Sequence, residues 1–318
     1  MFTFILPALL RPSTEQLPEL AVPALNELMR LGEFRFEKLS LTELYARYLC
    51  GSFTLPEKNS VYASPLSQQV GMHSVNLADG QTIGITAEEA ATLCNGLNEF
   101  FRDCARFTVL RPDLWTVQLS MPSLWHAPPV FDVLGQIDGS IRAEGEDAGQ
   151  WLQLQTEIQM WLHGHPMNRH RITSGKAPIN SIWLWEAPVD CPAISPTALI
   201  GSNSPWTQQS PLAVQPAPHN FAQWQQLCHD RQLNIAETSL FLDDLMASAC
   251  TGDVWDYRQI VQQWDERFFG PVCQALKKGS LKGVRLITDG LNGGTLTVKP
   301  PTFWSFLAGK RHFSGKNL

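Results

Sequence analysis

One segment concentrates polar and cationic side chains that the rest of the chain uses sparingly. Residues 163–185, HGHPMNRHRITSGKAPINSIWLW, contain three of the eight histidines, two arginines and two asparagines ahead of an apolar run. Imidazole is the commonest transition-metal ligand, so a metal site is one interpretation. However, His163, His165 and His170 are spaced by two and five residues, which does not bring their side chains together on one helical face. The spacing therefore argues against metal ligation.

Two further interpretations of this segment stay open. Arginine suits two-point binding of phosphate or carboxylate, so Arg169 and Arg171, with His165, Asn168 and Asn180, predict a pocket for a phosphorylated or carboxylated small molecule. Cationic side chains near a helix C-terminus also interact favourably with its dipole and its last carbonyl groups. On that alternative, the segment only ends a helix and leads into a buried strand.

Carboxylates form a second group of candidates because they follow predicted strands. The strand at 237–242 ends at Asp243 and Asp244, and the strand at 284–287 is followed by Asp289. Ligands of open parallel sheets bind beyond the carboxyl ends of the strands, where carboxylates suit a divalent metal or phosphoryl transfer. An Asp after a strand is also a common turn residue or helix cap, which is the alternative for each of the three.

The elements that position these residues alternate between strands and helices. Hydrophobic periodicity predicts strands at 2–6, 179–185, 198–201, 237–242, 284–287 and 295–298, and helices at 23–31, 41–49, 151–163, 221–228 and 254–268. Ser40 and Asp253 are the expected caps of two of these helices. This alternation predicts an α/β fold with a mostly parallel sheet and helices on both faces.

Between residues 66 and 144 the pattern changes. A strand at 75–77, a helix opened by the capping box of Thr86 and Glu89, and paired strands at 107–110 and 115–119 predict a small α+β unit. We therefore expect a core domain of residues 1–65 and 145–318 with an inserted α+β domain at 66–144. The stretch LPEKNS at 55–60 is the candidate for the first boundary.

Composition narrows the class of protein. The 318 residues carry a net charge of −6 without a basic block, which argues against nucleic-acid and membrane partners. Seven scattered cysteines without a C-x-x-C pair indicate a reduced, cytoplasmic protein, and the apolar start MFTFILPALLRPS indicates a first strand and not a signal peptide. The P-loop, dinucleotide-binding, serine-hydrolase and zinc-protease motifs are absent, and the Gly-rich run at 290–294 favours a hairpin.

The segment at 163–185 resembles a stretch of the archaeal-type cofactor-independent phosphoglycerate mutases. The matching residues are Glu157, Ile158, Gln159, His165, Pro166, Asn168, Arg171, Gly175, Pro178, Asn180 and Leu184. In order and spacing the whole chain is similar to the RpfE-type bacterial regulatory proteins, which have N-S-x-W-L-W where this chain has residues 180–185. The resemblance implies the alkaline-phosphatase-like core, which in that superfamily holds two divalent metals through Asp and His and has a Ser or Thr nucleophile at a helix start.

The positions that would hold these metals differ from the family pattern. The first strand ends in Leu6-Pro7-Ala8 where the family has Asp-Gly, and the family's Asp-His pair becomes Asp289-Gly290. Asp243 and Asp244 stand near a metal-binding Asp, but the His expected four residues later is absent. Around the nucleophile, Ser40 and Thr42 keep hydroxyl groups without the flanking glycines. The resemblance therefore predicts the fold with a lost two-metal site and no cofactor.

Three hypotheses follow for function. The first is a catalytically degenerate mutase-like protein that acts in regulation by binding a small anionic ligand, a protein partner or a second copy of itself. The second is a residual phosphatase or phosphotransferase that uses Thr42 or Ser40 as nucleophile with Asp243 nearby. The third is a structural or interaction protein in which the segment at 163–185 serves only as scaffold.

Overall fold

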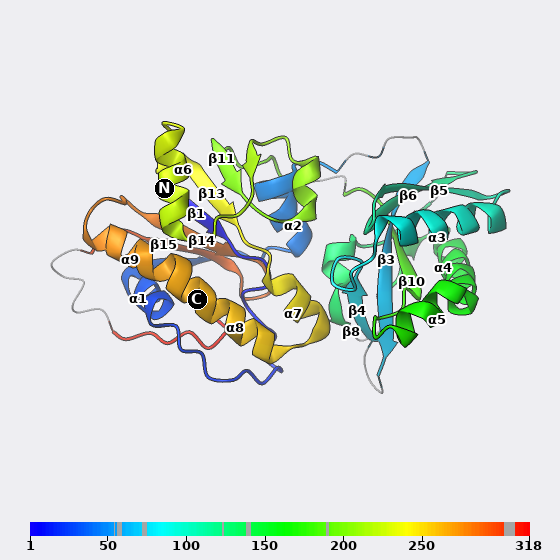
Figure 1. The fold of residues 1–318 in the computed structure, drawn as a ribbon, viewed down its shortest axis with the longest axis horizontal. Coiled ribbons are helices and arrows are strands. Elements are labelled where there is room, and N and C mark those ends of the chain that lie inside the picture. Colours follow the sequence, from blue (N-terminus) through cyan, green and yellow to red (C-terminus); the bar gives the residue numbers. More distant parts are fainter. Residues whose placement is uncertain are drawn as a thin grey trace. The chain divides into compact units, whose positions relative to one another are not determined.

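A computed structural model describes residues 1–53, 55, 59–71, 75–122, 124–137, 141–188, 191–301 and 309–318. The chain divides into two compact units (Figure 1). The first, the core unit, contains residues 1–52, 191–249 and 253–318, and the second, the inserted unit, contains residues 53–190 with 250–252. Within the described ranges, the helices include none that is long and apolar enough to cross a membrane.

A seven-stranded sheet forms the centre of the core unit, in the order β12, β11, β13, β1, β14, β15, β2. The first five strands are parallel, and β15 and β2 are antiparallel to their neighbours. The strands are β1 (Phe2–Ile5), β2 (Gly32–Phe36), β11 (Leu199–Gly201), β12 (Val214–Gln215), β13 (Thr238–Phe241), β14 (Val284–Thr288) and β15 (Gly294–Val298). The mostly parallel sheet is confirmed, and the run at 290–294 forms the predicted hairpin between β14 and β15.

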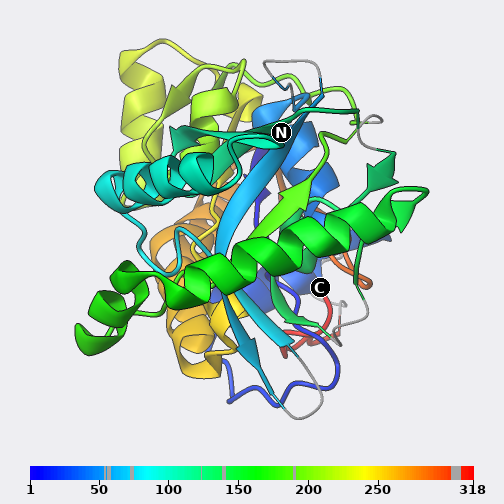
Figure 2. The ribbon, with the colours of Figure 1, turned by 90° about the vertical axis from the view of Figure 1, so that its right-hand side faces the viewer.

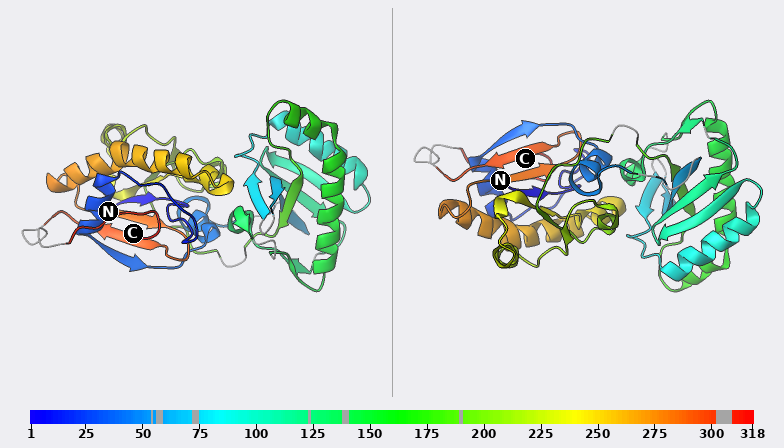
Figure 3. Two further views of the ribbon diagram at one scale, coloured as in Figure 1. Left: turned by 90° about the horizontal axis from the view of Figure 1, so that it is seen from below. Right: turned by 90° about the horizontal axis from the view of Figure 1, so that it is seen from above.

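Helices cover both faces of this sheet. Phe4 of β1 and Leu240 of β13 pack into one apolar core with residues of several helices, among them α8 and α9. Figure 3 shows this yellow-to-orange pair of helices along that face. On the other face, the ring of Phe241 lies 4.8 Å from that of Tyr45 in α2. The helices are α1 (Pro23–Leu31), α2 (Leu41–Tyr45) with a π-helical extension η1 (Ala46–Cys50), η3 (Pro205–Gln209), α6 (Phe221–Asp230), η4 (Ile235–Glu237), α7 (Leu245–Thr251), α8 (Val254–Trp264), η5 (Asp265–Phe269) and α9 (Gly270–Lys277).

The caps expected from the sequence are present in the core unit. Ser40 accepts a hydrogen bond from the Glu43 amide in a capping box, and Asp253 caps α8. The helix predicted at 254–268 forms α8 and the π-helical turn η5, and α9 follows directly. The buried carboxylate of Asp265 in that turn accepts the amides of Ala24 and Leu25, which lie in the first turn of α1. A side chain far away in the sequence therefore satisfies a helix start that lacks its own cap.

The inserted unit is built on an antiparallel sheet in the order β5, β6, β3, β4, β8, with β10 also paired to β3. Its strands are β3 (Ser60–Val70), β4 (Val75–Asp79), β5 (Ala105–Arg111), β6 (Leu114–Leu119), β8 (Gly135–Ile137) and β10 (Ser181–Trp185), with a separate pair β7 (Trp125–His126) and β9 (Glu144–Gly145). Its helices are α3 (Ala87–Phe100), η2 (Val130–Val133), α4 (Ala148–Gly164) and α5 (Pro166–Thr173). Figure 2 shows the long green helix α4 crossing the strands of this sheet.

The inserted unit extends beyond the expected limits of 66–144 at both ends. The strand predicted at 179–185 forms β10, but it pairs antiparallel with β3, and Trp151 of α4 donates a hydrogen bond to Leu184 of that strand. Residues 148–185 therefore belong to the inserted unit, and the parallel core sheet does not contain them. The first boundary falls near residue 53; of the stretch expected there, residues 56–58 lie outside the described part of the chain.

The capping box of α3 gives a direct test of a feature predicted from sequence. The Thr86 hydroxyl accepts the Glu89 amide, and the Glu89 carboxylate accepts the Thr86 amide. Replacing Thr86 by Ala removes one partner of the helix start, so we expect a loss of about 1 kcal/mol in the free energy of unfolding. Urea unfolding of Thr86→Ala and Thr86→Ser measures it. Serine keeps the hydroxyl, so equal losses in both variants would contradict a capping role.

Candidate functional site

The carboxyl ends of β1, β13 and β14 bring several candidate residues of the core unit to one edge of the sheet. Asp243 follows β13, and its carboxylate accepts a hydrogen bond of 3.0 Å from the hydroxyl of Tyr45 in α2. Burial raises the pKa of Asp243 to about 6, although hydrogen bonds from the Ser204 and Tyr45 side chains act in the opposite direction. Its neighbour Asp244 is exposed. Asp243 is thus a half-buried carboxyl group already engaged by protein hydroxyls.

The third carboxylate of this edge, Asp289, holds the end of the first strand. Its Oδ1 accepts the backbone amide of Ala8 at 2.7 Å, and Ala8 has a φ of 58°, in the left-handed region that a residue with a Cβ seldom occupies. The carboxylate therefore fixes a strained turn. Among the described residues, no group of three or more His, Cys, Asp or Glu side chains is arranged to hold a metal ion, and Asp243, Asp244 and Asp289 form no such group.

Ser40 and Thr42 reach the same edge through the start of α2. Leu39 forms a backbone bridge with Gly290, with the Gly290 amide bound to the Leu39 carbonyl at 2.8 Å. This bridge places the N-terminus of α2 beside the turn that follows Asp289. The Ser40 hydroxyl is used in the capping box, and Thr42 is buried. The tertiary structure thus gathers the hydroxyl candidates, Asp243 and Asp289 at one end of the sheet.

The histidine-rich segment lies in the inserted unit, where it forms the end of α4, the short helix α5 and strand β10. His165 links the two helices: it ends α4 and caps α5, because its Nδ1 accepts the Met167 amide at 3.3 Å. Its ring lies 4.7 Å from that of Trp161, and burial lowers the pKa of His165. His165 therefore accepts a backbone amide at the start of α5, which differs from the expected role of a cationic side chain at a helix C-terminus.

The two asparagines of the segment hold backbone groups. Asn168 is buried; its amide nitrogen donates to the carbonyls of Leu162 and Ile179, and its oxygen accepts the Ile179 amide. The Asn180 side chain pairs in the same way with the backbone of Gln68 in β3. Its oxygen accepts the backbone amide of Gln68 at 2.7 Å, and its nitrogen donates to the backbone carbonyl of Gln68 at 2.9 Å. Both side chains extend the hydrogen-bonding pattern of the fold where the chain enters β10, and the prediction of ligand binding by Asn168 is wrong because its polar atoms face protein.

Arg171 is the most buried cation of the segment. Its side chain is 0% exposed and donates to the carboxylate of Glu89 at 2.7 Å, to the carbonyl of Ala177 at 2.7 Å and to that of Ile83 at 2.5 Å. Burial raises the pKa of Glu89, but hydrogen bonds from the Thr86 amide and the Arg171 guanidinium outweigh it, so the pKa is lowered. The prediction that Arg171 binds an external anion is wrong because the guanidinium is enclosed. Arg169 is exposed, and its role as a ligand residue stays a prediction.

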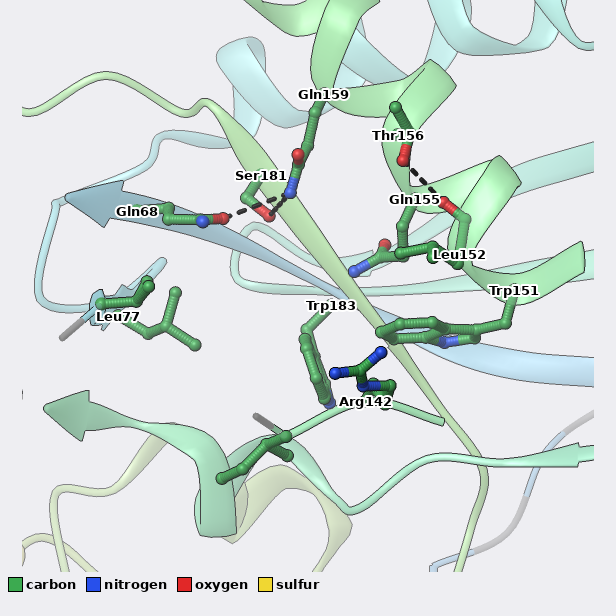
Figure 4. A pocket seen from close by; sticks show the side chains of 12 residues that line it. Gln68, Leu77, Arg142, Trp151, Leu152, Gln155, Thr156, Gln159, Ser181 and Trp183 are labelled. Carbon is green, nitrogen blue, oxygen red and sulfur yellow. Dashed lines mark hydrogen bonds between the residues drawn. The ribbon is translucent and has the colours of Figure 1, made fainter. Parts of the chain in front are cut away.

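A hollow between α4 and the sheet was missed by the sequence analysis (Figure 4). This α4 pocket has a volume of about 320 Å³, and its lining includes Gln68, Arg142, Trp151, Gln155, Gln159 and Trp183. The Gln159 amide donates to the side-chain oxygens of Gln68 and Ser181, each at 3.2 Å. Trp183 and Trp185 are both buried, as expected for core positions, but Trp183 also forms part of this wall.

The glutamine spacing on α4 was the available signal for this pocket. Gln155 and Gln159 are four residues apart and therefore lie on one face of the helix. The helix itself was predicted from its apolar residues alone. Gln155 is only 5% exposed, yet its Oε1 has no hydrogen-bond donor within the described structure. Buried acceptors without a donor are uncommon and costly. The amide is therefore a feature of the pocket that packing alone does not explain.

Comparisons with known proteins identify relatives that match a short segment of the sequence. No family model matches the chain. A segment of 57 residues is 40% identical to a probable 2,3-bisphosphoglycerate-independent phosphoglycerate mutase of Geobacter sulfurreducens, and 57 residues are 33% identical to the mutase of that name from Methanothrix thermoacetophila. Each match covers 18% of this chain and 14% of the relative.

Two solved structures align over most of the chain at low identity. One is the cofactor-independent phosphoglycerate mutase of Thermoplasma acidophilum, with a TM-score of 0.42 and 13% identity, covering 99% of this chain and 94% of that one. The other is the PH0037 protein of Pyrococcus horikoshii, with a TM-score of 0.46 and 10% identity, covering 94% and 87%. From the sequence matches, this chain is related to the 2,3-bisphosphoglycerate-independent phosphoglycerate mutases over a short part of their length.

Proposed function

We propose that this chain is a catalytically degenerate, phosphoglycerate mutase-like protein that has a regulatory function and acts by binding. The observation that carries the proposal is the use of the carboxylates at the end of the core sheet. Asp289 holds the Ala8 amide, Asp243 accepts the Tyr45 hydroxyl, and Asp244 points to a position exposed to solvent. Two adjacent divalent ions need several anionic or imidazole ligands each. The residues present do not fit such a pair of ions.

The end of the first strand adds support. The strand ends in Leu6-Pro7-Ala8 where the resembling mutases have Asp-Gly, so it brings no carboxylate to this edge of the sheet. Ala8 instead adopts a positive φ of 58° and donates its amide to Asp289. This turn therefore uses one of the remaining carboxylates for the fold.

The test combines metal binding with turnover. The full-length protein is titrated with Mn²⁺ and Zn²⁺ by calorimetry, and it is assayed with 3-phosphoglycerate and p-nitrophenyl phosphate with and without these ions. We expect no stoichiometric binding of two ions and no metal-dependent turnover, in contrast to an active mutase assayed in parallel. Tight binding of two ions with turnover that Asp243→Asn abolishes would overturn the proposal.

One observation favours a second candidate, a residual metal-free phosphatase. The bridge between Leu39 and Gly290 brings the start of α2, with Ser40 and Thr42, to the edge that carries Asp243 and Asp289. A hydroxyl and a carboxyl group in one place could transfer a phosphoryl group through a covalent intermediate. Burst kinetics with p-nitrophenyl phosphate in the presence of a chelator would support this candidate if Thr42→Val or Ser40→Ala removes the burst. Unchanged background hydrolysis in wild type and both variants would dismiss it.

A further inference from the structure

We propose that β2, the edge strand of the core sheet, pairs in antiparallel fashion with β2 of a second copy of this chain. β2 (Gly32–Phe36) is the last strand in the order of the seven-stranded sheet, and it pairs with β15 on one side. Figure 3 shows it as the blue arrow at the outer border of the core unit. The pairing joins two core sheets into one, and it does not depend on whether the core unit turns over a phosphate ester.

The strands at the other ends of the two main sheets are blocked or very short. At the end of β5, the Asn98 side chain donates to the Phe107 carbonyl at 2.9 Å and accepts the Phe107 amide at 2.6 Å. β8 has three residues and β12 has two. Proteins protect sheet edges in such ways because an open edge can pair with another chain. β2 has five residues, and within the described chain it has neither protection.

The backbone of β2 determines which residues can face a new strand. The amide of Glu37, just after β2, donates to the Gly293 carbonyl at 3.1 Å and therefore points toward β15. In an antiparallel ladder, successive residues direct their amide and carbonyl groups to alternate sides. Those of Phe34 and Phe36 therefore point away from β15, and no described residue forms a hydrogen bond with them. A partner strand must bind these groups.

A twofold arrangement with Phe34 opposite Phe34 of the second copy meets this condition. The two Phe34 residues then exchange amide-to-carbonyl bonds, and each Phe36 lies opposite Gly32 of the other copy. Between them, Glu33 lies opposite Arg35 of the second copy, and this happens twice because the arrangement is symmetric. Both pairs occupy positions without backbone hydrogen bonds, where Cα atoms approach to about 4.5 Å and side chains are closest.

The charges of β2 favour this register over the neighbouring ones. Glu33 and Arg35 are exposed and form no ion pair with a described residue. A register with Arg35 opposite Arg35 would place like charges together and would use backbone groups that face β15. A register centred on Phe36 would need Glu37, which is already paired with Arg47 at 2.7 Å. The register centred on Phe34 therefore pairs the two charges that have no partner in their own chain, and it also covers the ring of Phe36, which is 62% exposed.

Sedimentation equilibrium of the full-length protein tests whether the copies associate. Two five-residue strands bury less than the roughly 1,600 Å² of a standard protein interface, so we expect a weak dimer. The average mass should rise from one chain toward two as the concentration increases from micromolar to near-millimolar at low salt. Exposed charge pairs are screened by salt, so 1 M NaCl should weaken the association. A mass of one chain over the whole range would overturn the proposal.

Charge exchange tests the register. Glu33→Arg and Arg35→Glu each place like charges opposite one another, and we expect each variant alone to self-associate at least tenfold more weakly than wild type. An equimolar mixture of the two should dimerise like wild type, because every pair across the interface then joins opposite charges. The double variant Glu33→Arg/Arg35→Glu should also dimerise.

Glu19→Arg is the matched control, because Glu19 is an exposed carboxylate of the core unit outside β2 and the substitution makes the same change in charge. It should dimerise like wild type, and circular dichroism confirms that each variant is folded. Wild-type self-association in both single variants would place the contact on another surface and contradict the proposal. A mixture that stays as weak as its components would contradict the register centred on Phe34.

Discussion

Replacement of Arg171 by Ala is expected to lower the free energy of unfolding of the inserted unit by about 3–5 kcal/mol. The guanidinium is fully enclosed, and it is paired with Glu89 and with the carbonyls of Ile83 and Ala177. Its removal leaves a partly buried carboxylate without its counter-charge, takes a donor from each of the two carbonyls, and leaves a cavity as well. Urea unfolding followed by tryptophan fluorescence measures the loss.

Arg169 provides the matched control because it lies two residues away on the same short helix and is exposed. We expect Arg169→Ala to change stability by less than about 0.5 kcal/mol. The anion-pocket interpretation makes the opposite prediction: Arg171→Ala would keep the stability of wild type and lose binding of inorganic phosphate. That result would restore Arg171 as a ligand residue and contradict its assignment as a buried brace.

The second large effect concerns the pH dependence of stability, and it arises from Asp243. Burial raises the pKa of this carboxyl group from 3.8 to about 6. The folded state therefore binds more protons than the unfolded state between about pH 4 and pH 6, and stability from this group is present at low pH and is lost as the pH rises through that window. A shift of this size corresponds to about 2–3 kcal/mol.

Asp243→Asn isolates this contribution, because asparagine is neutral and can still accept the Tyr45 hydroxyl. We expect the variant and wild type to be similar near pH 4 and the variant to be more stable by about 2–3 kcal/mol above pH 7. Urea unfolding at several pH values gives the difference, with the exposed Asp244→Asn as control. If wild type instead gains stability over the variant as the pH rises, the ionised carboxylate is stabilised in the fold, as a cation site at this edge would require.

Much of the local structure was predictable from sequence because short-range physics decides it. The start of α2 at Ser40, the capping box of α3 and the hairpin after β14 depend on residues within a few positions of one another. The alternation of apolar strands and amphipathic helices likewise indicated the parallel sheet, since it reflects which faces must be buried. These features needed no knowledge of partners distant in the chain.

The assignment of the histidine-rich segment to a unit was not predictable in the same way. An apolar strand such as 181–185 can pair in a parallel or an antiparallel sheet. Its antiparallel pairing with β3 places it in the inserted unit and not in the core sheet, and this pairing joins residues far apart in the chain. The cations of the segment looked available for a ligand because sequence does not reveal that Glu89, Ile83 and Ala177 enclose Arg171. Because these partners bury the guanidinium, Arg171 is a structural residue and not the binding residue that the sequence suggested.

By itself, then, the sequence determined many of the helices and strands and the caps at Ser40, Thr86 and Asp253. It also determined which carboxylates follow the strands of the core, because each of these features depends on local periodicity and turn chemistry. Only the tertiary structure decided which polar atoms are already satisfied. It engaged Asp243 with Tyr45 and Asp289 with Ala8, and among the described residues it supplies no donor to the buried oxygen of Gln155. The physical reason is that hydrogen-bond satisfaction and burial arise from contacts between residues far apart in the chain, which periodicity does not encode.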